Sequence, residues 1–129
     1  MIDLEESRQI HRTLIKLFGG LDGIRDLPAL KSALARPFQT FDHEDLHPTP
    51  IHKAASLIES ILINHPFIDG NKRTGYVALR SFLLSNGLDI VATQEEKYAF
   101  VIDIASGNIQ FEQIVEWLNS HTAEVRDVH

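Results

Sequence analysis

Residues 65–75 read His65-Pro66-Phe67-Ile68-Asp69-Gly70-Asn71-Lys72-Arg73-Thr74-Gly75, a polar, turn-prone segment between two apolar runs. Apolar residues recur at three- and four-residue intervals over residues 51–62 before it and 77–83 after it. That spacing is typical of one face of an α-helix. The sequence therefore predicts two core helices joined by a short polar loop.

The residues within the loop predict where each helix ends. Pro66 disfavours helical backbone angles at His65, so the first helix should end there. Asp69-Gly70 supplies a turn, and Asn71 is a preferred N-cap for the second helix. Lys72 would then lie in the first helical turn.

The charges of this loop indicate a phosphate site. A helix N-terminus is electropositive, so the cations Lys72 and Arg73 at that place suggest an anion beside them, most naturally a phosphate. Asp69 could hold Mg²⁺ on the same phosphates, because this ion takes one or two carboxylates plus phosphate oxygens. His65 adds a titratable base. Together these residues predict a phosphoryl or nucleotidyl transfer site.

Two other interpretations of the loop start from the same residues. The polar side chains could be ordinary turn and cap residues, with Lys72 and Arg73 on a solvated helix face. Gly70 and Gly75 also imitate the start of a P-loop, but Tyr76-Val77 stands where that motif requires Lys-Ser/Thr. The P-loop interpretation is therefore excluded, and the turn interpretation stays open at this point.

The nine residues His65 to Arg73 closely resemble the signature of the Fic/Doc family, and the ending Asn-Lys-Arg-Thr is similar to the Doc (death-on-curing) toxin branch. The resemblance extends over most of the chain. It includes Gly19-Gly20-Leu21, Gly23-Ile24-Arg25-Asp26, Leu34-Ala35-Arg36-Pro37 and Phe82-Leu83-Leu84-Ser85-Asn86-Gly87.

The resemblance implies a role for each motif residue. His65 corresponds to the general base that deprotonates a target hydroxyl, and Asp69 to the carboxylate that holds the metal. Arg73 corresponds to the catalytic arginine that neutralises the phosphates, and Phe67 to the apolar anchor of the loop. The residues that bind the nucleotide cofactor correspond to Gly70, Asn71, Lys72 and Arg73. ATP and Mg²⁺ are the implied cosubstrate and ion.

Two departures from the fuller Fic pattern bear on the reaction. Lys72 stands where Fic adenylyltransferases usually have a second glycine, and Tyr76 where they have a second arginine. Doc-type proteins share both features and act as kinases and toxins, so the resemblance implies phosphate transfer to a Ser or Thr hydroxyl of a protein such as translation elongation factor Tu. AMP transfer is the alternative, since Gly70 is retained as in many adenylyltransferases.

Rivals from other classes are weaker. A non-catalytic nucleotide- or protein-binding module would not be expected to keep His65, Asp69, Asn71 and Arg73 together. A metal phosphohydrolase requires several His and Asp side chains as metal ligands, and the chain has no His-Asp dipeptide. Fic-type enzymes are commonly inhibited by a Ser/Thr-x-x-x-Glu-Gly/Asn helix, which this sequence lacks. The resemblance then implies that a separate antitoxin protein supplies the inhibition.

Length and composition limit the number of domains and the classes of partner that the chain can have. A length of 129 residues predicts a single domain over 1–129. Eighteen acidic and twelve basic residues give a net charge of −6, the wrong sign for nucleic-acid binding. The absence of cysteine excludes thiol enzymes and zinc fingers. No apolar run reaches the roughly eighteen residues of a membrane span, and the acidic N-terminus is unlike a signal peptide. We therefore expect a cytoplasmic protein without a membrane partner.

The rest of the chain predicts an all-α fold, a Fic-type bundle of about six helices with a short flap before the motif. Apolar periodicity marks helices over residues 4–18 and 111–118, Pro28 opens a short helix, and Thr93 starts a capping box. The polar, proline-bounded residues 38–49 would form the flap.

Several individual side chains also receive an expectation. His11 should be solvated or at a boundary. Phe38 and Phe41 should either pack the flap onto the body, which we favour, or face the substrate. The polar histidines and acids of residues 42–52 should be solvated charges and not metal ligands. The core-facing side of the helix after Thr93 should carry Tyr98, Val101, Ile102 and Ala105. Trp117 should lie half exposed at an edge, and residues 123–129 should be frayed.

Overall fold

The computed structural model describes residues 2–125. Within them the chain forms six α-helices, one 3₁₀ helix and four strands of two or three residues. This confirms the predicted all-α fold with its flap. No helix of this part of the chain has the length and apolar character needed to cross a membrane.

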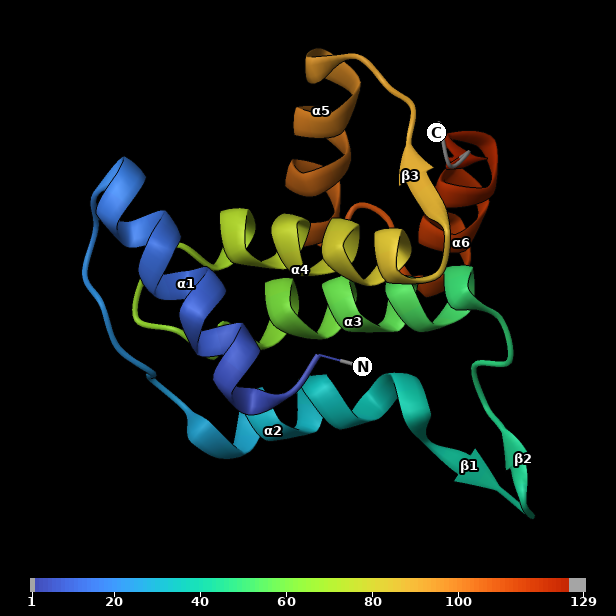
Figure 1. Cartoon of the computed structure of the whole chain (residues 1–129), viewed down its shortest axis with the longest axis horizontal. Helices are drawn as coiled ribbons and strands as arrows, with labels where there is room; N and C mark the ends of the chain where they lie inside the picture. Colours follow the sequence, from blue (N-terminus) through green and yellow to red (C-terminus); the bar gives the residue numbers. More distant parts are fainter. Residues whose placement is uncertain (1, 126–129) are drawn as a thin grey trace.

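Helices α3 (Pro50–Asn64) and α4 (Asn71–Ser85) form the centre of the molecule, where they run side by side in opposite directions (Figure 1). Ile58, Ile61 and Leu62 of α3 are fully buried between the surrounding helices. The two helices approach closely at Gly75, where an added Cβ would lie 2.9 Å from Cδ2 of Leu62. A glycine is therefore needed at this crossing.

The N-terminal helices cover one side of this pair. Helix α1 (Leu4–Phe18) begins at Asp3, whose side chain accepts a hydrogen bond from the backbone N–H of Glu6, and it ends at Gly19 as predicted. Helix α2 (Leu27–Ala35) leads into the 3₁₀ helix η1 (Arg36–Phe38). Residues 65–70 between α3 and α4 form the motif loop. Figure 1 shows α1 crossing the end of α4 that follows this loop, and α2 lying along the side of α3 that faces away from α4.

The flap is an antiparallel hairpin of β1 (Thr40–Phe41) and β2 (Glu44–Asp45). Its two turn residues both have positive φ, as a tight hairpin turn requires. Phe38 packs edge-on against Phe82 with ring centroids 6.1 Å apart, as predicted. For Phe41 the favoured prediction of packing was wrong: the residue is 75% exposed, because it lies on a two-residue strand that projects from the body.

The C-terminal part contains β3 (Leu88–Ile90), α5 (Gln94–Ala105), α6 (Phe111–Ser120) and β4 (Thr122–Glu124). Strand β4 pairs with β3 in antiparallel register. The prediction that the chain frays from residue 123 was therefore wrong up to residue 125, because the exposed edge of β3 offers backbone partners. Residues 126–129 lie outside the described part of the chain.

Helix α5 begins at the predicted capping box of Thr93 and Glu96. Val101 and Ala105 of its expected core face do pack against the core, but they are only partly buried. Phe100 and Ile104 enter the core, whereas Tyr98 is 71% exposed. Phe100 stacks on Trp117 of α6 at 3.8 Å, which leaves Trp117 partly buried at the edge of the core, as predicted. The face carrying Tyr98 is thus free to line a cleft.

Candidate active site

The motif loop joins the C-terminus of α3 to the N-terminus of α4. His65 caps α3 in the left-handed region, with φ 47° and ψ 58°. Gly70, with φ 73°, is the N-cap of α4, so the assignment of Asn71 to that position was wrong. A positive φ at the cap favours glycine, and the Asn71 side chain instead accepts from the N–H of Phe67 and donates to its carbonyl, both at 3.0 Å.

Phe67 anchors the loop in the core. Its side chain is 1% exposed, and its ring stacks on that of His11 with centroids 4.1 Å apart and planes at 7°. His11 is itself 2% exposed, so the prediction that it is solvated or at a boundary was wrong. It lies seven residues after Leu4 and three before Leu14, on the apolar stripe of α1, and this spacing was the signal for its burial.

The segment from Gly23 to Asp26 fixes the loop by backbone hydrogen bonds. The N–H groups of Arg25 and Asp26 both donate to the carbonyl of Pro66, at 2.8 and 3.0 Å, and the N–H of Ile68 donates to the carbonyl of Gly23. These bonds hold the loop on both sides of Phe67 and satisfy backbone groups that the two helices leave unpaired.

Asp69 is oriented by two backbone N–H groups. Its Oδ1 accepts from Gly70 at 2.9 Å, and its Oδ2 accepts from Leu21 at 3.2 Å. Gly20 lies so close that an added Cβ would be 2.7 Å from Oδ2. The carboxylate is thus held by the turn after α1, which is distant from Asp69 in the sequence.

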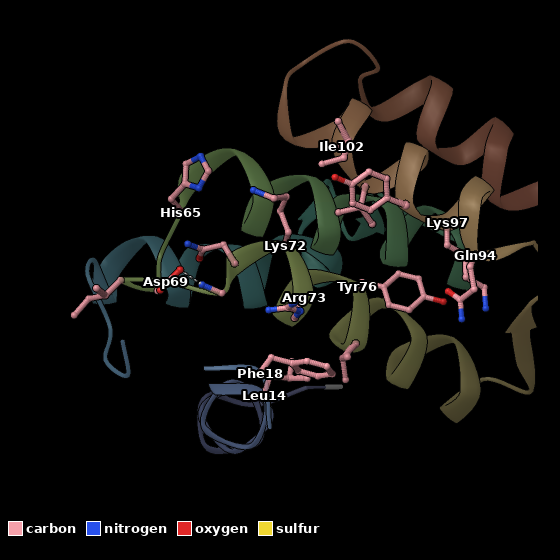
Figure 2. Close-up of a pocket in the computed structure, with 16 residues that line it drawn as sticks. Leu14, Phe18, His65, Asp69, Lys72, Arg73, Tyr76, Gln94, Lys97 and Ile102 are labelled. Carbon is pink, nitrogen blue, oxygen red and sulfur yellow. Dashed lines mark hydrogen bonds between the residues drawn. The ribbon is translucent and has the colours of Figure 1, made fainter. Parts of the chain in front are cut away.

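All the predicted site residues lie in one cleft of about 780 Å³. The start of α4 forms its floor, and the end of α1 and the exposed face of α5 form its sides (Figure 2). Among the lining residues are His65, Asp69, Gly70, Asn71, Lys72 and Arg73. The sequence pattern did not predict the contribution of α5, which includes Lys97, Tyr98, Val101 and Ile102.

The cations of the cleft have no acidic partner in the described part of the chain. Within residues 2–125 no ion pair joins Lys72 or Arg73 to a carboxylate. The guanidinium carbon of Arg73 instead lies 4.4 Å from the ring centroid of Phe18. Since the N-terminus of α4 is also electropositive, this end of the cleft is suited to an anion.

The side chains of the cleft fit a metal ion that is held mainly by the phosphate oxygens of a bound molecule and only in part by the protein. No group of three or more His, Cys, Asp or Glu that could hold a metal occurs in the described residues, including the histidine-rich segment 42–52. Among the described residues that line the cleft, Asp69 is the one that is acidic, and each of its oxygens keeps a lone pair beyond its bond to backbone. One carboxylate with phosphate oxygens is a set that Mg²⁺ accepts.

Comparison with known proteins identifies a family and a relative of this chain. Residues 1–83, which include the whole motif loop, match the model of the family described as Fic/DOC family. The chain is also 43% identical over 75 residues to Toxin Doc of Mycolicibacterium smegmatis, an alignment that covers 58% of this chain and 58% of that toxin. The chain belongs to the Fic/DOC family.

Proposed function

We propose that the protein is a Doc-like toxin that transfers the γ-phosphate of ATP to a Ser or Thr hydroxyl of another protein. The observation that carries the proposal is the single cleft that contains His65, Asp69 and Arg73, with Tyr76 further along the same wall. A base, a carboxylate for Mg²⁺ and cations at a helix N-terminus are the parts that phosphoryl transfer needs.

His65 would act as the general base. Its side chain is exposed at the mouth of the cleft, and its ring makes no hydrogen bond to the described residues, so it is available to a substrate (Figure 2). The target hydroxyl oxygen would attack the γ-phosphorus as the bond to the β–γ bridging oxygen breaks. ADP then leaves with that oxygen, and the hydroxyl proton passes to the imidazole of His65.

The start of α4 would hold the phosphates. Lys72, Arg73 and the free N–H groups of the first helical turn supply donors and positive charge where charge develops during transfer. Asp69 would hold Mg²⁺, which when bound neutralises charge on the phosphates. Gly70 and Asn71 keep the loop in the shape that presents these groups.

Lys72 and Tyr76 favour phosphate transfer over AMP transfer. A side chain with bulk and charge follows Asn71 in place of a second glycine, and Tyr76 cannot supply a second guanidinium. The retained Gly70 favours the alternative, a Fic-type adenylyltransferase.

Incubation with ATP labelled at the α or the γ position, together with bacterial lysate or purified elongation factor Tu, separates the two reactions. We expect label on protein from the γ position alone, and none with a folded His65→Ala variant. Label from the α position on the same band would establish AMP transfer. Absence of any label would leave a binding module as the better explanation.

The toxin assignment is tested in cells. The relative Toxin Doc carries that activity in its name, and we propose the same for this chain, with a separate antitoxin protein as its inhibitor. Expression of the chain alone should arrest growth, and His65→Ala should relieve the arrest. Unimpaired growth at a high level of the intact protein would contradict the assignment.

A further inference from the structure

The buried His11 connects helix α1 to the motif loop. Its Nε2 lies 2.7 Å from the backbone carbonyl oxygen of Asp69, a residue 58 positions away. A carbonyl oxygen only accepts hydrogen bonds, so Nε2 must carry the hydrogen and donate it. No other hydrogen bond to this carbonyl occurs within residues 2–125.

The His11 ring has little freedom to move. One face stacks on Phe67, and the second nitrogen, Nδ1, lies 3.4 Å from Oδ1 of Asp22. The side chain is 2% exposed. A ring held by a stacked neighbour and by contacts at both nitrogens is a rigid support for the group that it touches.

Asp69 receives its position from three sides. His11 holds its backbone carbonyl, while the N–H groups of Leu21 and Gly70 orient its carboxylate. The two contacts to the carboxylate are exposed, whereas the backbone contact to His11 is partly buried. A shift of the Asp69 backbone would move the carboxylate relative to Lys72 and Arg73.

We propose that His11 is a positioning residue, which fixes Asp69 for metal binding through the hydrogen bond from Nε2 to the Asp69 carbonyl. The identity of the metal rests on the proposed function, whereas the positioning of Asp69 by His11 does not. His11 is not part of the motif. It reaches the site only because α1 packs against α4.

Three variants separate the hydrogen bond from packing. His11→Phe keeps a flat ring against Phe67 but removes the donor. His11→Gln restores an amide N–H near the place of Nε2. Arg12→Ala is the matched control on the neighbouring residue, because Arg12 is exposed and contacts Asp22 at 3.8 Å but does not reach the loop.

The first measurement needs no substrate. The amide resonances of Gly70 and Leu21 report on the Asp69 carboxylate, because both N–H groups donate to it. In NMR spectra of the free protein, His11→Phe should shift or broaden both signals, His11→Gln should return them toward the wild type, and Arg12→Ala should leave them unchanged.

The second measurement uses the metal. With Mn²⁺ as a paramagnetic substitute for Mg²⁺, affinity measured in the presence of ATP should fall about tenfold or more in His11→Phe and recover in His11→Gln, the size expected when the support of a metal ligand is removed. If wild-type protein transfers no phosphate, the proposed function fails, while the NMR result still decides the role of His11.

Two results with the variants would overturn the inference. One is a folded His11→Phe variant with unchanged Gly70 and Leu21 signals and unchanged Mn²⁺ affinity; the other is equal loss in His11→Phe and His11→Gln. If His11→Phe does not fold, the position of the ring hydrogen of His11 in the wild-type protein tests the inference. Long-range ¹H–¹⁵N spectra should find the hydrogen on Nε2, and a ring protonated at Nδ1 alone would exclude the donated bond.

Discussion

The guanidinium of Arg25 donates a hydrogen bond of 2.7 Å from Nε to the backbone carbonyl of His65, the residue proposed as the base. Its Nη2 donates to the carbonyl of Asn64 at 2.6 Å. Arg25 therefore satisfies two carbonyls at the C-terminus of α3 and places a cation at the negative end of the helix. It also holds His65 in the left-handed conformation, which is unfavourable for a residue with a side chain.

Replacement of Arg25 should thus impair proton removal by His65 more than the binding of ATP. We expect Arg25→Ala to lower kcat for transfer about tenfold or more with little change in KM for ATP, because a displaced base impairs proton removal and leaves the phosphate site in place. Arg25→Lys should recover part of the loss. Steady-state kinetics with γ-labelled ATP measures both constants, and Lys31→Ala, an exposed change on α2, is the control. A raised KM with normal kcat would contradict this role.

Gly20→Ala should displace the carboxylate of Asp69. The added Cβ would lie 2.7 Å from Oδ2, and a misplacement of about 1 Å can cost roughly a hundredfold in rate. Gly19→Ala is a close control: Gly19 also has positive φ, so it carries a similar backbone cost, but its Cβ would meet nothing within 4 Å. The two variants should lose a similar amount of thermal stability, but Gly20→Ala should transfer phosphate far more slowly than Gly19→Ala. Equal rates would show that the contact with Asp69 is unimportant.

Phe18 should support the phosphate-binding arginine. A cation over an exposed aromatic ring is stabilised by about 0.5–1 kcal/mol, so Phe18→Leu should weaken ATP binding about two- to fivefold. Phe18→Tyr should keep most of the affinity. Leu17→Ala removes a neighbouring exposed side chain that does not line the cleft, and calorimetric titration with ATP should find it unchanged.

His47 should make stability depend on pH near the base of the flap. Burial lowers the pKa of His47 below its ordinary value of 6.5, and the nearby basic groups Arg36, Lys53 and His52 add to this effect, while Glu59 opposes it. Its Nδ1 is buried without a partner among the described residues. The unfolded chain therefore binds a proton at higher pH than the folded one, so stability is lost as pH falls from about 6.5 through the folded pKa.

Urea unfolding of wild type and His47→Gln across a pH range from about 7.5 to about 5 tests this sign. The free energy of unfolding should fall more steeply with acid in the wild type, because the glutamine side chain of the variant cannot be protonated in this range. His43→Asn, a change at the exposed flap turn, serves as the control for the loss of a histidine. A steeper acid loss in His47→Gln than in the wild type would reverse the conclusion.

The local sequence around the motif was enough to predict the elements that carry the site. Pro66 and the glycine-containing turn separate two helices whose apolar spacing is unambiguous, and the capping box at Thr93 starts α5 where expected. Such signals are local, since they depend on backbone angles and hydrogen bonds within a few residues. They located the polar loop and its charged residues, although the N-cap fell on Gly70 instead of Asn71.

Only the tertiary structure decided which residues support the loop and which face of α5 lines the cleft. His11 is polar but fills the space beside Phe67, whereas Tyr98 is aromatic but lines the open cleft. The pairing of β4 with β3 joins Thr122 to Ile90, with two whole helices between them in the sequence. Periodicity determines that a segment has faces, but burial of a face depends on partners brought together from distant parts of the chain, and short-range sequence patterns carry no information about those partners.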